Sequence, residues 1–162
     1  MVNCWFSQSF ATFTYGSLTL HTRLIDERYP DYENVIPVSN PNTLVINRAE
    51  LLGAVRRMHL YANRTTHQVK LALSGSEVVV SAQDLDSSNE ARETLACQYD
   101  GEDFEIGFNA RFLDQMLANL SSEQVSLALS TPNRAGLLSP VGQGNGEDVL
   151  MLVMPVMLTN YV

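Results

Sequence analysis

The 162-residue sequence has little that points to disulfide chemistry, metal binding or a membrane. Its two cysteines, Cys4 and Cys97, lie far apart, form no Cys-x-x-Cys pair and have no histidine at metal-ligand spacing. No apolar run approaches the roughly 20 residues that a membrane helix needs. The first residues lack the basic stretch of a signal peptide. We therefore expect two reduced thiols, no metal or other cofactor, and a cytoplasmic location.

Patterns typical of catalysis are also missing. The three histidines, His21, His59 and His67, stand in no recognisable arrangement with a nucleophile and a carboxylate. The glycine-rich stretch 142–146 lacks the Gly-Lys-Ser/Thr ending of a phosphate-binding loop, so we expect a hairpin loop there. Residues 84–86 begin like a calcium loop but no glycine follows at the sixth position, which favours a solvated turn. The sequence indicates a protein that is not an enzyme.

Basic residues are scarce and unevenly distributed. The chain has ten basic and eighteen acidic residues, and thus a formal net charge of −8. This charge at first argues against binding nucleic acid. Half of the basic residues nevertheless fall in two segments, 47–64 and 109–119, that we expect to be helices. The basic residues there are Arg48, Arg56, Arg57, Arg64 and Arg111, against only Glu50 and Asp114 as acids. The sequence thus predicts an acidic protein with two basic helices.

An internal repeat organises residues 38–158. The stretch Val-Lys-Leu-Ala-Leu-Ser at 69–74 returns as Val-Ser-Leu-Ala-Leu-Ser at 125–130. Before each copy stand a strand-like run, an asparagine that can cap a helix (Asn47 or Asn109) and a helical pattern. In the first copy Glu50 completes a capping box. Two strand–helix–strand–strand–strand units in series are therefore expected.

Both predicted helices are amphipathic. The buried stripes expected from their periodicity are Leu51, Leu52, Val55, Met58 and Ala62 on the first helix, and Phe112, Leu113, Met116 and Leu120 on the second. Strand patterns follow the first helix at 68–73, 77–82 and 93–99, and the second at 124–129, 135–139 and 149–158. With 45% hydrophobic and 17% charged residues, the chain has the composition of a folded domain. The predicted class is α+β, with two antiparallel sheets covered by two helices.

Residues 1–37 fit neither repeat. Segments 10–15 and 18–25 predict one hairpin about Gly16, followed by an irregular stretch from 28 to 37. A lone hairpin is marginally stable at best in water. We therefore expect this piece to pack on the main domain or to belong to a neighbouring domain.

The closing run 150–158 is almost wholly apolar and is interrupted by Pro155. Segment 149–153 is expected to be a core strand. Because proline cannot donate to a β-ladder, pairing should weaken there and leave residues 154–158 at an edge or on the surface. Methionine is common on adaptable binding surfaces because its side chain is flexible and polarizable. The run predicts a strand that continues into a binding surface.

Four motifs, in this order and spacing, resemble the bacterial DNA polymerase III β subunit, the sliding clamp. They are Arg-Leu-Ile-Asp at 23–26, Tyr-Pro-Asp-Tyr at 29–32 with Val-Ile-Pro at 35–37, Glu-Ile-Gly-Phe-Asn at 105–109, and Val-Met-Pro at 153–155. The similarity runs from about residue 10 to residue 158 and fits the last third of a clamp subunit. It implies that residues 38–162 are the third domain, with its DNA-clamp fold, and that 1–37 are the last hairpin of the middle domain and the linker.

The resemblance implies a non-enzymatic processivity factor that dimerises into a ring, with its helices facing the DNA. The implied partners are duplex DNA without sequence preference, the DNA polymerase III α subunit, the clamp loader, repair proteins and a second copy of the subunit. The implied DNA-facing residues are Arg56, Arg57, Arg64 and Arg111. Leu60 and Tyr61, off the buried stripe at the end of the first helix, match the family's subunit interface.

The resemblance also implies a hydrophobic pocket for short peptides. The matching positions are Pro30, Asn34, Val35, Asn109, Phe112, Val153, Met154, Pro155, Val156, Met157 and Leu158. The chain departs from the family at Glu27, where a glycine is usual, and at 154–158, where Met-Pro-Met-Arg-Leu is familiar. The other half of the pocket comes from the middle domain. A stand-alone peptide-binding adaptor that no longer forms a ring is the alternative.

Overall fold

The computed structural model describes residues 1–144 and 146–158 and contains two compact units, Met1–Glu33 and Asn34–Val162. The first unit is a three-stranded antiparallel sheet, in which β2 (Phe10–Tyr15) lies between β1 (Asn3–Phe6) and β3 (Leu18–Arg23). The predicted hairpin is present, and Gly16 supplies the left-handed backbone of its turn with φ +57°. Strand β1 was not predicted. A short 3₁₀ turn, η1 (Tyr32–Val35), follows this sheet.

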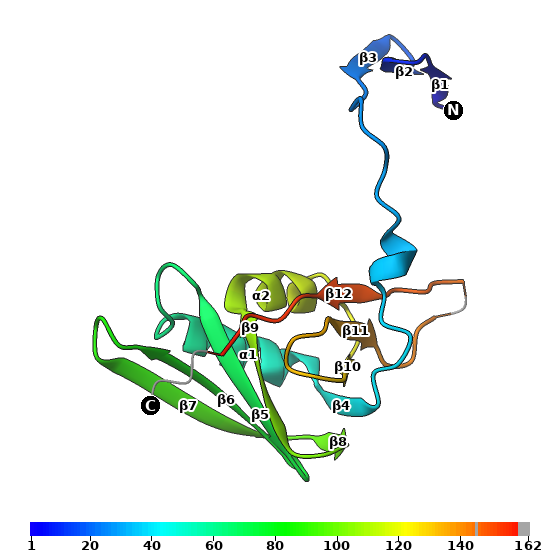
Figure 1. The fold of residues 1–162 in the computed structure, drawn as a ribbon. Helices are drawn as coiled ribbons and strands as arrows, with labels where there is room; N and C mark the ends of the chain where they lie inside the picture. Colours follow the sequence, from blue (N-terminus) through cyan, green and yellow to red (C-terminus); the bar gives the residue numbers. More distant parts are fainter. Residues whose placement is uncertain (145, 159–162) are drawn as a thin grey trace. The chain divides into compact units, whose positions relative to one another are not determined.

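The second unit consists of two antiparallel sheets and two helices, α1 (Arg48–His59) and α2 (Ala110–Ala118), as Figure 1 shows. The five-stranded sheet has the order β12-β11-β10-β4-β8, and its strands are β4 (Asn42–Asn47), β8 (Gln98–Asp100), β10 (Gln124–Leu129), β11 (Gly136–Pro140) and β12 (Met151–Val153). The four-stranded sheet has the order β7-β6-β5-β9, from β5 (Gln68–Ser74), β6 (Glu77–Asp84), β7 (Asn89–Ala96) and β9 (Phe104–Asn109). The α+β class predicted from the repeats is confirmed.

The two repeats exchange their first strands. Strand β4, which precedes α1, pairs with β10, which follows α2, so that Leu44 lies opposite Leu127. In the same way β9, which precedes α2, pairs with β5, which follows α1, and places Ile106 opposite Leu71. Each sheet is therefore built from both repeats.

The hydrophobic core lies between the sheets and the helices. Along β5, Val69, Leu71 and Leu73 are buried while the alternate side chains point outward, as the two-residue period of a strand requires. Phe108 is the largest of the fully buried side chains. Its Cζ lies 3.4 Å from the position that a Cβ on Gly136 would occupy. The ring of Phe108, on the four-stranded sheet, therefore packs on the backbone of Gly136 in the five-stranded sheet. Phe108 thus joins the two sheets.

Asparagine caps begin both helices, as predicted. The Oδ1 atom of Asn47 accepts hydrogen bonds from the backbone N–H groups of Ala49 and Glu50 at 2.9 and 3.1 Å. Asn109 Oδ1 accepts one from the N–H of Arg111 at 2.9 Å. These bonds satisfy backbone donors that the first helical turn leaves without partners.

The predicted end of the first helix, residue 64, was wrong. Helix α1 ends at His59, because the chain turns at Asn63, whose Oδ1 accepts from the N–H groups of Thr65 and Thr66. The Nδ2 atom of Asn63 donates to Asp84 at 3.0 Å and to the neighbouring Asp86 at 3.2 Å. The solvated turn predicted there is wrong for Asp84, which is buried; hydrogen bonds from Asn63 and Ser87 lower the pKa of its carboxyl group.

Three further differences from the prediction concern the bounds of two strands and the buried face of α2. The segment predicted as one strand at 93–99 is divided between β7 and β8, because the chain crosses from one sheet to the other at Cys97. The closing strand spans only 151–153 rather than 149–158. Phe112 is exposed rather than buried, because α2 packs through Ala110 and Leu117 together with the predicted Leu113.

Candidate functional site

The closing tail, residues 154–158, runs from the edge of one sheet to the edge of the other (Figure 1). It leaves β12 at Val153, which is buried and lies opposite Gly136. Beyond Pro155 the N–H of Val156 donates a 2.8 Å hydrogen bond to the carbonyl oxygen of Gly107 on β9. The predicted weakening of pairing at the proline is thus seen as a single bridge in place of a strand.

The side chains of the tail are largely available to a ligand. Met154 is 59% exposed and Met157 is 75% exposed, while Leu158 is half-buried at the rim of a groove on the outer face of the four-stranded sheet. Two exposed methionines, three residues apart along the tail, offer flexible, apolar contacts. The tail has the chemistry of a surface for apolar peptides.

Two predicted pocket residues lie at the start of α2. Phe112 is 56% exposed and presents its ring on the helix surface, while Asn109 is occupied as the helix cap. Helix α2 packs against β12, immediately before the tail. The second unit therefore brings Asn109, Phe112 and the tail to one region. Apolar groups that converge beside a helix can hold an extended peptide.

The remaining predicted pocket residues precede β4. Val35 is exposed at the end of η1, and Asn34 opens the second unit. Pro30 belongs to the first unit, Met1–Glu33. The assignment of these three residues to a pocket stays a prediction.

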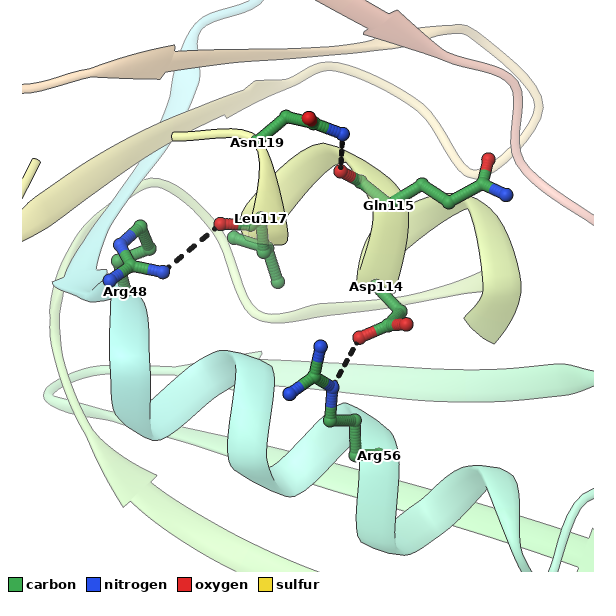
Figure 2. A network of polar contacts seen from close by, with 6 residues as sticks. All are labelled: Arg48, Arg56, Asp114, Gln115, Leu117 and Asn119. Carbon is green, nitrogen blue, oxygen red and sulfur yellow. Dashed lines mark hydrogen bonds and ion pairs between the residues drawn. The ribbon is translucent and has the colours of Figure 1, made fainter. Parts of the chain in front are cut away.

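Two of the four predicted DNA-facing arginines, Arg56 and Arg57, are held by ion pairs. Arg56 on α1 lies 2.5 Å from the Asp114 carboxylate on α2 (Figure 2). Arg57 forks onto Glu93 of β7, with Nε 2.9 Å from one carboxylate oxygen and Nη2 2.6 Å from the other. Such two-pronged pairs are among the stronger polar contacts in proteins. The hydrogen bond raises the pKa of Arg57 and lowers that of Glu93.

The other arginines of this group differ from one another. Arg48 donates to the backbone carbonyls of Leu117 at 3.1 Å and Ser122 at 2.9 Å, so it caps the end of α2 (Figure 2). Arg64 and Arg111 are exposed and form no ion pair within residues 1–144 and 146–158. Arg111 on α2 and Arg64 in the loop after α1 therefore remain without an ion pair, whereas Arg48, Arg56 and Arg57 are bound to other groups of the protein. Sequence reasoning missed Glu93, although the alternation of β7 places it on the same face as Leu95.

The only close histidine pair of the described chain lies between the end of α1 and the start of β5. His59 Nε2 is 3.3 Å from His67 Nδ1, and the rings meet edge to face. Burial, followed by the charges of Arg111 and His59, lowers the pKa of His67. Within the described residues no three metal-binding side chains gather, and no helix is both long and apolar enough to cross a bilayer.

Comparison with known proteins agrees with this architecture. Residues 33–156 match the family described as DNA polymerase III beta subunit, C-terminal domain. The beta sliding clamp of Pseudomonas putida is 32% identical over 158 residues, which are 98% of this chain and 42% of that protein. The chain thus spans about two fifths of the length of the curated relatives it matches.

Solved structures give the same result. A DNA polymerase sliding clamp from Pseudomonas aeruginosa, crystallised with a ligand, superposes with a TM-score of 0.89 at 30% identity over 97% of this chain and 42% of its own. The DnaN sliding clamp from Bartonella birtlesii bound to griselimycin gives 0.88 at 32% identity, over 97% of this chain and 41% of its own. No match favours the stand-alone adaptor.

Interlaced repeats with two helices on two antiparallel sheets define an α+β domain of the DNA-clamp class. The chain belongs to the DNA polymerase III β subunit family, and its second unit corresponds to the C-terminal domain of that family.

Proposed function

We propose that this chain acts as the C-terminal part of a ring-forming DNA sliding clamp, a non-enzymatic processivity factor. Its C-terminal domain spans 38–162, and 1–37 are the last hairpin of the middle domain and the linker. In the ring it encircles duplex DNA and holds the DNA polymerase III α subunit, the clamp loader and repair proteins. The observation that carries this proposal is the exposed apolar tail beside α2, in a chain of this family.

Within the second unit, the proposed peptide pocket comprises Asn34, Val35, Asn109, Phe112, Val153, Met154, Pro155, Val156, Met157 and Leu158. Val153 contributes from the core, where it is buried, and anchors the tail. The exposed methionines and Phe112 supply the contacts. An apolar peptide would bind by displacing water from them, which is the main source of affinity in such pockets.

A two-dimensional amide NMR titration with the peptide Gln-Leu-Ser-Leu-Phe tests the pocket. We expect saturable shifts at Val35, Phe112 and the tail, because bound apolar side chains change the surroundings of those amides. A scrambled peptide of the same composition is the control. If a well-dispersed spectrum shows no movement with either peptide, this chain has no working pocket.

The proposed DNA-facing residues are Arg56, Arg57, Arg64 and Arg111, which act on phosphates without reading sequence. Because Arg56 and Arg57 are paired with carboxylates, the lining attracts DNA weakly, as a sliding ring requires. Leu60 and Tyr61 are exposed in the loop after α1, at 81% and 41%, and are proposed to meet a second subunit.

Replacing Asp114 by asparagine is expected to strengthen binding to duplex DNA severalfold. The substitution removes the carboxylate that holds Arg56, so one more guanidinium can reach a phosphate. The slope of log affinity against log salt should steepen by about one. Fluorescence anisotropy with labelled duplex at several salt concentrations measures both quantities.

Asp148→Asn is the matched control, since it changes the net charge equally at an exposed position in the loop between β11 and β12. Equal effects of Asp114→Asn and Asp148→Asn would show that net charge, and not the release of Arg56, determines DNA affinity.

A further inference from the structure

The tail lies unusually close to Gly107. A Cβ built on this glycine would stand 2.7 Å from the backbone oxygen of Val156 and 2.9 Å from Cδ2 of Leu158. Real Cβ atoms do not come so near a backbone oxygen, so a side chain at 107 would have to move the tail. Gly107 does not have a left-handed backbone, so close approach alone accounts for its lack of a side chain.

The residues on the outer face of β9 explain how the tail can approach Gly107 so closely. Glu105 and Asn109 flank Gly107 at the two-residue spacing that places all three on one face. Glu105 forms a 2.9 Å ion pair with Lys70, which lies directly opposite Gly107 on β5. Gly107 therefore leaves a gap in a row of outward side chains.

The tail fills this gap. The Val156 N–H bonds to the Gly107 carbonyl at 2.8 Å, and Leu158 continues to the rim of a groove of about 730 Å³ on the same face. The groove crosses the sheet beside Lys70, Ser81 and Arg92. One backbone hydrogen bond and one leucine side chain thus fix the end of the tail.

The contact also sets the distance between two parts of the proposed pocket. Gly107 lies two residues before the cap Asn109 and five before Phe112, all on β9 and the first turn of α2. Val156 lies between Met154 and Met157. Since these segments are short and their backbones are fixed by β9, α2 and β12, the bridge at Gly107 determines how the methionines stand relative to Phe112.

We propose that Gly107 is a positioning residue of the peptide pocket: by lacking a side chain it lets the tail dock on β9 and holds the tail methionines beside the start of α2. This inference deepens the proposed function and rests on it. Gly107 itself does not touch the peptide. A side chain there would lift the tail and loosen the pocket while leaving the two sheets intact.

Gly107→Ala tests the proposal in the full 162-residue chain. Methionine-methyl NMR is suited to it, because the six methionines give few signals that report on both tail and core. Without peptide, we expect the Met154 and Met157 signals to shift, while the signal of buried Met58 stays in place. The dissociation constant for Gln-Leu-Ser-Leu-Phe should rise about tenfold or more.

Gly144→Ala is the matched control, since a Cβ there meets no atom within 4 Å and its backbone is not left-handed. It should leave both the methyl signals and the affinity unchanged. Val156→Pro removes the same hydrogen bond from the tail side with no atom added at 107, and should reproduce the tail shifts. It decides the question if Gly107→Ala does not fold.

Unchanged Met154 and Met157 signals in the folded variants would overturn the inference, as would displaced signals with an affinity within twofold of the parent chain. A parent chain that does not respond to the peptide would contradict the proposed function instead. The control of the tail by Gly107 would then be decided by the methyl shifts alone.

Discussion

An alanine in place of Phe108 is expected to lower the free energy of unfolding by about 3–5 kcal/mol. The ring is fully buried and packs on the backbone of Gly136 in the other sheet. Its removal leaves a cavity where the two sheets meet, which the rigid strands on either side cannot close. For a domain of ordinary stability such a loss is a large part of the total.

Denaturant unfolding followed by circular dichroism measures this loss, with Phe104→Ala as the control. Phe104 stands on the same strand and is only partly buried, so its truncation should cost less. A Phe108→Ala variant no less stable than Phe104→Ala would contradict the role of Phe108 as the link between the sheets.

Phe112→Ala is expected to have the opposite effects. Because the ring is 56% exposed, its removal should change the free energy of unfolding by about 0.5 kcal/mol or less. Peptide affinity should fall about tenfold or more, since an exposed aromatic ring beside an apolar tail has the character of a binding hot spot. Isothermal titration with Gln-Leu-Ser-Leu-Phe measures the affinity.

Gln115→Ala provides a control on the same helix, because Gln115 is likewise exposed and its side chain is polar. It should bind the peptide like the parent chain. If both variants weaken binding equally, the effect lies in the helix as a whole and Phe112 has no special role.

Local signals in the sequence predicted much of this structure. The caps Asn47 and Asn109, the alternation at 68–73 and 124–129, and the turn at Gly16 depend on neighbouring residues, and each is found near its predicted place. Such features are encoded within a few residues of the chain. They determined the class of the fold.

Features that depend on distant parts of the chain were not predicted. Both repeats carry strands of similar pattern, so nothing in their periodicity states that β4 pairs with β10 and β9 with β5. The exposure of Phe112 was missed for the same reason. Periodicity identifies an apolar stripe on a helix, but it does not state which residues of the stripe are covered by the sheets.

The candidate site shows the same division. The apolar closing run and the charge of the predicted helices indicated the tail and the helix arginines, and the resemblance supplied their roles. The pairing of Arg56 with Asp114 and of Arg57 with Glu93 depends on how α1 meets α2 and β7, which the sequence alone does not state. The role of Gly107 needed the path of the tail, because only its distance to Val156 distinguishes it from any other glycine in a strand.

The exchange of first strands makes the repeat indivisible. A cut between the two copies, after β8, would leave one fragment with β4 but without its partner β10, and the other with β9 but without β5. Neither fragment holds a complete sheet, because each repeat supplies a strand with which the other must pair. The sequence of the domain divides into two repeats, yet we expect the domain to fold and unfold as a whole.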